Sequence, residues 1–259
     1  MPVTKRLRIF AGPNGSGKST IVGVVDKLVG CPYFVNADEI YAKLSQKGHL
    51  SFDDYLVVLD VETFREQFRR SGFFPKSAHA EELIDGIRKT GDNMLTVPDK
   101  AVDSYFAAFV ADFLRDNMLN VVQQFTIETV MSDPRKADYI RTAKRLGYRI
   151  YLYFVSTKDV AINIARVAQR VQLGGHDVPQ EKIEKRYIRS LENIFEVLML
   201  CDRAYFFDNS AEQWTLLAEY ETGTLMIREP KVPAWFNRYV YEPFRAEAAS
   251  LPRKDITGR

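Results

Sequence analysis

Short apolar runs alternate with longer amphipathic segments along most of the chain. Five runs have the length and the β-branched or aromatic content of buried strands, and they cover residues 7–11, 33–36, 125–129, 148–155 and 204–208. Residues 222–227 are expected to close an edge hairpin with the residues before them. Because helical segments separate most of the strands, the pattern predicts an α/β fold with a mainly parallel five-stranded sheet.

Apolar side chains recur at three- and four-residue steps in the segments that we expect to be helical. The clearest case is 105–119, and a second helix should open at Asp133-Pro134 and end at Gly147. A further helix-like segment runs from about residue 51 to 70. Its spacing favours Asp60 as an ordinary helix charge over a metal ligand.

Several regions are expected to lie outside the core sheet of a single domain, 1–259. Residues 45–102 are interrupted by glycines and prolines, and we interpret them as a helical cap insertion over a substrate pocket. Residues 160–193 form a predicted lid, and residues 228–259 a C-terminal extension in which the Trp235 cluster should pack as a helix on the core.

A glycine-rich motif follows the first predicted strand and precedes the first predicted helix. Residues 12–20 read Gly-Pro-Asn-Gly-Ser-Gly-Lys-Ser-Thr and match G-x-x-x-x-G-K-[ST]. Such a loop directs backbone N–H groups and a helix N-terminus at phosphate oxygens. The motif predicts that a nucleoside triphosphate is bound by Gly12, Pro13, Asn14, Gly15, Ser16, Gly17, Lys18, Ser19 and Thr20. Lys18 would reach the β- and γ-phosphates, and the Ser19 hydroxyl would hold Mg²⁺.

Two predicted strands end close to a carboxylate, Asp38 after the second and Glu128 in the third. The carboxyl ends of parallel strands border the ligand crevice of an open α/β sheet. A phosphotransferase needs a carboxylate near ATP to accept a proton from a hydroxyl, and these two residues fit that requirement best. Asp38 would also suit the N-cap of the helix that follows it.

A basic segment with a glycine hinge lies between the fourth and fifth strands. Arg166 and Arg170 share one face of a predicted helix, Gly174-Gly175 breaks it, and the next helix carries Lys182, Lys185, Arg186 and Arg189. We interpret this segment as a lid whose arginines neutralise charge on a transferring phosphoryl group. The alternative is a pair of solvated faces whose cations pair with Glu181, Glu184 and Glu192. His176 is either a phosphate or substrate contact or a loop residue bonded to backbone.

Composition narrows the classes of partner. The net charge of +2 gives no general bias toward nucleic acid or membrane, and no apolar run has the length of a membrane span. Cys31 and Cys201 are far apart and without metal-ligand spacing, so we expect neither a disulfide nor a metal pair. The start of the chain has no secretory apolar stretch, and a cytoplasmic protein is expected.

Four strings together resemble the zeta toxin family of P-loop kinases. They are FVNADEI (34–40), FTIETVMS (125–132), YRIYLYFV (148–155) and the lid sequence RVAQRVQLGGHDVPQEKIEKRYIRSLEN (166–193). The resemblance implies an ATP-dependent kinase related to toxins that phosphorylate the 3′-hydroxyl of UDP-N-acetylglucosamine. It implies that Asp38 is the general base, that Glu128 with Thr129 binds the sugar, and that lid cations clamp the phosphates. It also makes an antitoxin protein a candidate partner.

The chain departs from the family pattern in three places. The toxins have Thr two positions after the glutamate, whereas Thr129 here follows Glu128 directly; a toxin lid arginine falls near His176; and residues 45–102 have no clear counterpart. We therefore assign catalysis to Asp38, Lys18 and Arg170, ATP binding additionally to Arg166, Arg170 and Arg186, and substrate binding to Asp38, Glu128, Thr129, Arg189 and His176. Two alternatives stay open: a kinase that acts on NAD, a nucleoside or a polynucleotide end, and a non-catalytic ATP-binding regulator.

Overall fold

The computed structural model describes residues 4–98, 101–175 and 177–250. All five predicted strands are present, as β1 (Arg6–Ala11), β2 (Phe34–Val35), β6 (Gln124–Thr129), β7 (Arg149–Ser156) and β8 (Arg203–Asp208). The expected edge hairpin adds β9 (Thr215–Glu221) and β10 (Thr224–Ile227). The seven strands have the order β10-β9-β8-β7-β1-β6-β2. β2 is parallel to β6 and β7 to β8, whereas β8, β9 and β10 are antiparallel, so the predicted α/β fold is confirmed.

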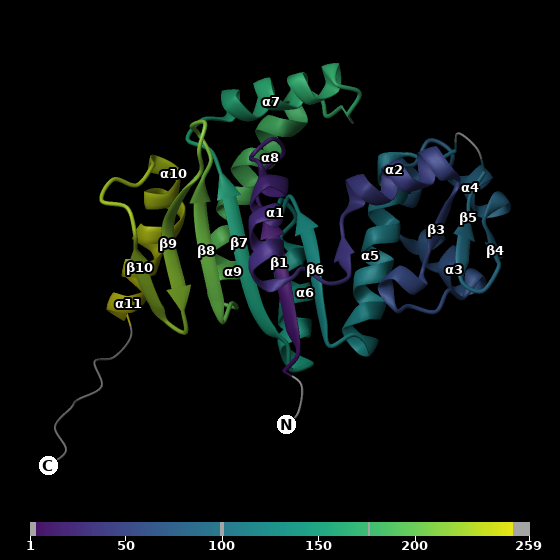
Figure 1. Ribbon diagram of the computed structural model, residues 1–259, viewed down its shortest axis with the longest axis horizontal. Coiled ribbons are helices and arrows are strands. Elements are labelled where there is room, and N and C mark those ends of the chain that lie inside the picture. Colours follow the sequence, from purple (N-terminus) through teal and green to yellow (C-terminus); the bar gives the residue numbers. More distant parts are fainter. Residues whose placement is uncertain (1–3, 99–100, 176, 251–259) are drawn as a thin grey trace, which may run out of the picture. The chain divides into compact units, whose positions relative to one another are not determined.

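Helices connect the strands of the sheet (Figure 1). They are α1 (Lys18–Val29), α2 (Ala37–Lys47), α3 (Val61–Arg70), α4 (Ala80–Gly86), α5 (Ser104–Val121), α6 (Arg135–Arg145), α7 (Val160–Gln172), α8 (Gln180–Glu192), α9 (Ile194–Leu198), α10 (Ala234–Phe236) and α11 (Glu242–Ser250). Local chemistry sets several of their ends. The Asp103 carboxylate accepts hydrogen bonds from the N–H groups of Tyr105 and Phe106 and so starts α5. Gly147 adopts a φ of +85° after α6, as expected for a glycine that ends a helix.

The chain forms two compact units, which are described separately. The first comprises Met1–Ile9, Val22–Thr129 and Arg145–Arg149. The second comprises Phe10–Ile21, Val130–Lys144 and Ile150–Arg259. We call them unit 1 and unit 2.

Unit 1 has an aromatic core built around α5, against which α2 also packs. Phe64 lies at its centre, with ring centroids 4.9 Å from Phe113 and 5.1 Å from Phe109. Phe68 packs against Phe106 at 5.2 Å. These are edge-on or tilted contacts, the arrangement that aromatic quadrupoles favour. Helix α3, which lies inside the predicted insertion, thus shares a core with α5.

Three short strands in this region were not predicted. β3 (His49–Ser51), β5 (Met94–Thr96) and β4 (Arg88–Thr90) form a separate antiparallel sheet in the order β3-β5-β4. Each strand is three residues long, which is too short for a recognisable alternation of apolar and polar positions.

The predicted helix over residues 51–70 is correct from Val61 onward, and before it only Asp53–Tyr55 form a short 3₁₀ helix. The buried Asn93 side chain donates to the Val57 carbonyl at 2.8 Å and accepts from the Leu59 N–H at 2.8 Å, which satisfies this backbone without a helix. Asp60 caps α3 by accepting from the Thr63 N–H at 2.7 Å, so no metal role is needed to explain it. The helix is interrupted by Asn93, a residue more than thirty positions away in the chain. Local periodicity cannot reveal such a contact.

Unit 2 has a core of stacked and edge-on rings along β7 and β8. Phe10 stacks on Tyr153 at 4.7 Å, and Tyr153 stacks on Tyr205 at 5.2 Å. Trp235 in α10 lies 5.9 Å from Phe154, and Phe236 lies 5.4 Å from Phe206. The prediction that the Trp235 cluster packs on the core is confirmed.

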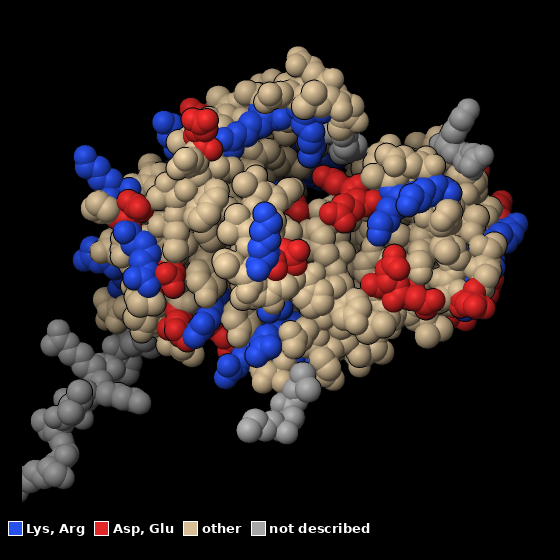
Figure 2. Space-filling view, viewed as in Figure 1, with Lys and Arg blue, Asp and Glu red and all other residues tan. Residues whose placement is uncertain are grey.

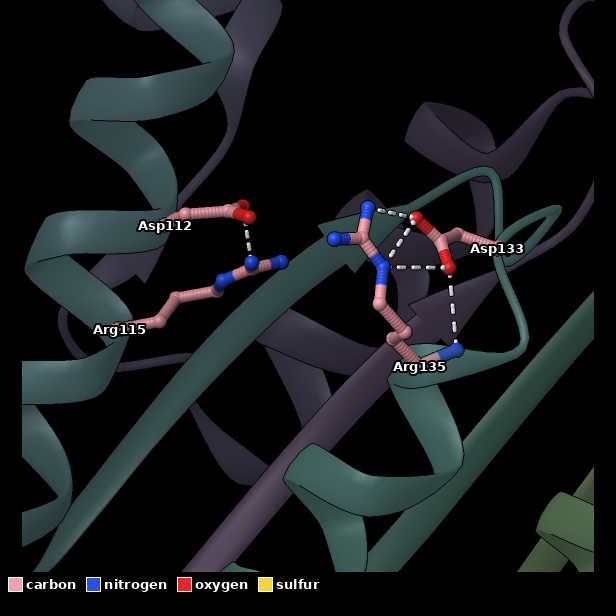
Figure 3. Close-up of polar contacts among 4 residues, drawn as sticks. All are labelled: Asp112, Arg115, Asp133 and Arg135. Atoms are coloured by element: carbon pink, nitrogen blue, oxygen red, sulfur yellow. Dashed lines mark hydrogen bonds and ion pairs between the residues drawn. The ribbon is translucent and has the colours of Figure 1, made fainter. Parts of the chain in front are cut away.

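Close ion pairs fix individual helices in each unit (Figure 3). In unit 1, the buried Arg115 of α5 pairs with Asp112 one turn earlier. In unit 2, the Arg135 side chain turns back to the Asp133 carboxylate, with Nη2 2.5 Å from Oδ2. Asp133 also accepts from the Arg135 N–H at 3.0 Å, so it supports the start of α6 with both charge and a backbone hydrogen bond.

Both cysteines are free thiols, in agreement with the prediction of no disulfide. Within the described residues, no helix combines the length and the apolar character that a bilayer crossing requires.

Candidate functional site

The glycine-rich loop lies in unit 2, between β1 and α1, and Lys18 is the first residue of α1. Gly12, Gly15 and Gly17 have φ values of +143°, +74° and +89°, conformations that side chains disfavour. A Cβ atom on Gly12 would lie 2.0 Å from the Val155 carbonyl oxygen, and one on Gly15 would lie 2.5 Å from the Asn163 carbonyl oxygen. The loop therefore requires glycine for both backbone angle and space.

The start of α1 suits an anion. No acidic residue occupies its first turn, so nothing there offsets the positive end of the helix dipole. The Lys18 ammonium donates to the carbonyls of Gly12 at 3.0 Å and Pro13 at 3.1 Å and is held inside the loop. Ser19 and Thr20 are exposed, and the buried Ser16 hydroxyl has no hydrogen-bond partner among the described residues. These groups fit a triphosphate.

The side chains of two asparagines hold the glycine loop. One lies on α7 of the lid region, and the other directly follows β8. The Asn163 side chain, on α7, donates to the Asn14 carbonyl at 2.6 Å and accepts from the Thr157 hydroxyl. The Asn209 side chain, directly after β8, donates to the Ser16 carbonyl at 2.9 Å. Both asparagines are buried, at 0% and 8% exposed. The backbone that would contact phosphate is thus fixed before any ligand binds.

The segment predicted to be a lid folds as helices α7 and α8, and the predicted break at Gly174-Gly175 separates them. Arg186 of α8 donates to the Asn14 side chain at 3.3 Å, which brings the lid directly onto the glycine loop. Arg166 of α7 donates to the Asn209 carbonyl at 2.8 Å. Figure 2 shows Lys and Arg side chains gathered below α7 in this view.

The other basic residues of the lid region differ from Arg166 and Arg186 in their surroundings. Arg170 is half-buried on α7, with its side chain against Gly175, and Arg189 is exposed on α8. Lys185 pairs with Glu181 on the outer face of α8, as the solvated-face alternative predicts for that residue. His176 lies outside the described residues, so its predicted role stays a prediction.

The two lid helices share a small apolar core and are anchored to unit 2. Val167, Val178 and Ile183 are buried together between α7 and α8. The Tyr187 hydroxyl donates to the Thr157 carbonyl at 2.6 Å, and the Asn193 side chain donates to the Met131 carbonyl at 2.9 Å. Burial raises the pKa of Tyr187 to about 12, so the phenol keeps the proton that it donates. Buried apolar contacts and two hydrogen bonds therefore hold the base of the lid region.

Three of the five predicted acceptor residues, Asp38, Glu128 and Thr129, belong to unit 1. Glu128 and Thr129 are the last two residues of β6, and Asp38 and Glu39 are in the first turn of α2. The residue that caps α2 is Asn36, which corrects the alternative that Asp38 is the cap. Asn36 also donates to the Glu128 carboxylate at 2.8 Å. Figure 2 shows acidic side chains gathered near the start of α2.

Glu39 adds a group that the sequence analysis did not select. Partial loss of hydration raises the pKa of its carboxyl, and the Glu128 charge raises it further, while Lys43 opposes both effects. Repulsion between Glu39 and Glu128 indicates a local excess of negative charge, which favours a ligand that donates hydrogen bonds or carries a proton to be removed.

Asn36, Asn163 and Asn209 are site residues that were not predicted from the sequence. Asn36 had a usable signal, because an asparagine two residues before Asp38 is a preferred helix cap. Asn163 and Asn209 had none, since their partners Asn14 and Ser16 lie 149 and 193 residues away in the chain.

Comparisons with solved structures relate the fold to known proteins. A complex of AvrRxo1-ORF1 and AvrRxo1-ORF2 with sulphate ions matches at a TM-score of 0.55 and 14% identity, over 93% of this chain and 63% of that chain. The same pair with ATP matches at 0.55 and 15% identity, over 100% of this chain and 67% of that chain. The chain therefore shares a mixed α/β fold with these structures.

Sequence comparison relates a short segment of the chain to a known protein. An uncharacterized protein of Haemophilus influenzae (strain ATCC 51907 / DSM 11121 / KW20 / Rd) is 32% identical over 63 residues, which are 24% of this chain. The match spans 45% of that relative's length. No protein-family model matches the chain.

Proposed function

We propose that this protein is an ATP-dependent phosphotransferase that moves the γ-phosphoryl group to a hydroxyl of a nucleotide-linked metabolite. UDP-N-acetylglucosamine is the first candidate acceptor. The observation that carries the proposal is the glycine loop of unit 2, pinned by Asn163 and Asn209 and contacted by Arg186 of the lid. A phosphate-binding loop combined with a basic lid is what phosphoryl transfer requires, because its catalysis depends on positioning and on charge stabilisation.

In this proposal the donor is held by unit 2. Lys18 moves from the Gly12 and Pro13 carbonyls to the β- and γ-phosphates, and Arg166, Arg170 and Arg186 contact the phosphate chain. Among the described residues, no three His, Cys, Asp or Glu side chains are grouped to hold a metal. When bound, Mg²⁺ would be held by the Ser19 hydroxyl together with the phosphates and would supply charge neutralisation there.

The acceptor residues are proposed from the sequence resemblance. Asp38 accepts the proton of the acceptor hydroxyl, the hydroxyl oxygen bonds to the γ-phosphorus, and the bond from that phosphorus to ADP breaks. Glu128 and Thr129 accept hydrogen bonds from the acceptor, and Arg189 and His176 are its further contacts.

The similarity to AvrRxo1-ORF1 and AvrRxo1-ORF2 with ATP supports ATP as the donor. Those structures contain two proteins, which supports the further proposal that a partner protein, such as an antitoxin, binds this chain.

The test is incubation of the protein with Mg²⁺, γ-labelled ATP and a panel of acceptors. The panel contains UDP-N-acetylglucosamine, NAD, nucleosides and an oligonucleotide with a free 5′ end. We expect label to be transferred to the sugar nucleotide, with a mass increase of one phosphoryl group. Transfer to another compound of the panel would show that this compound, and not UDP-N-acetylglucosamine, is the acceptor. ATP binding without transfer to any of them would favour the non-catalytic regulator.

A further inference from the structure

The Asn36 side chain joins two elements of unit 1 that carry the proposed acceptor groups. Its Oδ1 atom accepts from the N–H groups of Asp38 at 2.7 Å and Glu39 at 3.2 Å. Its Nδ2 atom donates to Oε2 of Glu128 at 2.8 Å, across a sequence separation of 92 residues. One amide therefore contacts both the turn that carries Asp38 and the carboxylate of Glu128.

The strand register explains why this contact forms. β2 and β6 are parallel, with Phe34 opposite Thr126 and Val35 opposite Ile127. Asn36 follows Val35 and Glu128 follows Ile127, so the two side chains leave neighbouring strands at the same level. Asn36 has an extended backbone, with φ of −133° and ψ of 122°, which is typical of a residue that ends a strand and caps a helix.

Only one orientation of the amide satisfies these contacts. The oxygen must face the two N–H donors of α2, and the NH₂ group must face the carboxylate. The reverse orientation would place donor against donor and acceptor against acceptor. Asparagine is also the residue of this length that supplies both functions, because aspartate has no donor and serine is too short to reach Glu128 from the cap position.

We infer that Asn36 is a positioning residue for the acceptor, which orients the Glu128 carboxylate and the Asp38 turn together. This inference rests on the proposed function. A hydrogen bond to a charged group is among the stronger ones, so it restricts Glu128 to one rotamer before the acceptor binds. The entropy cost of ordering the Glu128 side chain when the acceptor binds is then smaller than it would be without the hydrogen bond from Asn36.

A kinetic test separates two roles of Asn36: the cap of α2 and the hydrogen bond to Glu128, which we call the tether. Asn36→Ser keeps an N-cap acceptor for α2 but cannot reach Glu128. We expect it to raise the KM for the acceptor about tenfold, which corresponds to about 1.4 kcal/mol, while the KM for ATP changes less than about twofold. Asn36→Ala removes the cap as well and should also lower kcat. An unchanged acceptor KM in Asn36→Ser would overturn the inference.

A second cap serves as the matched control. Asp60 caps α3 in the same unit through one side-chain bond to the Thr63 N–H. Asp60→Ala should lower the unfolding temperature as Asn36→Ala does and leave both KM values unchanged. In a Glu128→Ala background, Asn36→Ser should have no further effect on the acceptor KM, because the tethered group is absent. A full tenfold effect there would contradict the tether.

A measurement without turnover keeps the inference separate from the proposed function. In protein labelled with ¹⁵N-asparagine, the side-chain amide signal of Asn36 is identified by its loss in Asn36→Ser. Glu128→Ala should shift this signal and speed its hydrogen exchange, and an unmoved signal would overturn the tether. Wild-type protein that transfers phosphate to no acceptor would reject the proposed function, while the amide signal would still decide whether Asn36 holds Glu128.

Discussion

The side-chain amide of Asn209 donates a hydrogen bond to the main-chain carbonyl of Ser16, 2.9 Å away and 193 residues earlier in the chain. A Cβ atom on Gly17 would lie 2.0 Å from the same amide nitrogen. The glycine loop and the end of β8 are therefore fitted to each other, and a change on either side should alter how the loop meets phosphate.

Asn209→Ala should weaken ATP binding about tenfold, because the loop backbone must then be ordered by the ligand itself. Isothermal titration with ATP and Mg²⁺ measures this. Asn117→Ala is the matched control, since the Asn117 side chain makes the same kind of bond to the Phe113 carbonyl at 2.8 Å, within α5 of unit 1. The control should lose stability and keep its ATP affinity. Equal ATP affinities in the two variants would mean that Asn209 does not organise the loop.

Gly17→Ala should destabilise unit 2 by roughly 1–3 kcal/mol and abolish ATP binding, because Gly17 has φ of +89° and no space for a methyl group. Gly23→Ala provides the contrast. Gly23 lies within α1, and a Cβ atom there meets nothing within 4 Å. That variant should gain roughly 0.5–1 kcal/mol from helix propensity and bind ATP normally. Denaturant unfolding and ATP titration of both variants check the pair.

Asp38→Asn should keep ATP affinity and reduce phosphoryl transfer by roughly 10²–10⁴-fold, because the amide cannot accept the hydroxyl proton. The backbone N–H of residue 38 still bonds to Asn36, so the fold of α2 should be unchanged. Asp85→Asn, an exposed residue of α4, should behave as wild type. Single-turnover transfer assays distinguish them, and near-normal transfer by Asp38→Asn would remove this residue from the mechanism.

The Asp133 and Arg135 pair should make stability depend on pH at the acidic end. The hydrogen bond from the Arg135 side chain lowers the pKa of Asp133 from its ordinary value of 3.8. A depressed pKa means that the folded state binds the proton less readily than the unfolded state. The stabilisation is therefore present above pH 3.8 and is lost as the pH falls through the lower folded value.

Asp133→Asn tests this contribution while it retains an oxygen for the Arg135 N–H. Because both side chains are partly exposed, the variant should lose only about 0.2–1 kcal/mol at pH 7. The difference from wild type should shrink as the pH falls below 3.8. A difference that stays constant with pH would show that the charge of Asp133 is not its source.

Much of this architecture is predictable from sequence because its causes are local. The five core strands, the edge hairpin, α5 and the helix ended by Gly147 follow from short-range periodicity and turn chemistry. The error over residues 51–60 has a long-range cause, the Asn93 side chain that replaces helical hydrogen bonds at Val57 and Leu59. The strands β3, β4 and β5 gave too short a pattern to be recognised.

The same division applies to the candidate site. The sequence by itself determined the glycine loop, because Gly12 to Ser19 specify their own backbone conformation, and it also determined the carboxylates at the ends of strands and the basic lid helices. Only the tertiary structure decided what holds these groups. Asn163 and Asn209 reach the loop from distant segments, and Asn36 finds Glu128 through the register of β2 and β6. A single hydrogen-bonding amide leaves no periodic trace in a sequence, so these partners become visible only when the chain is folded.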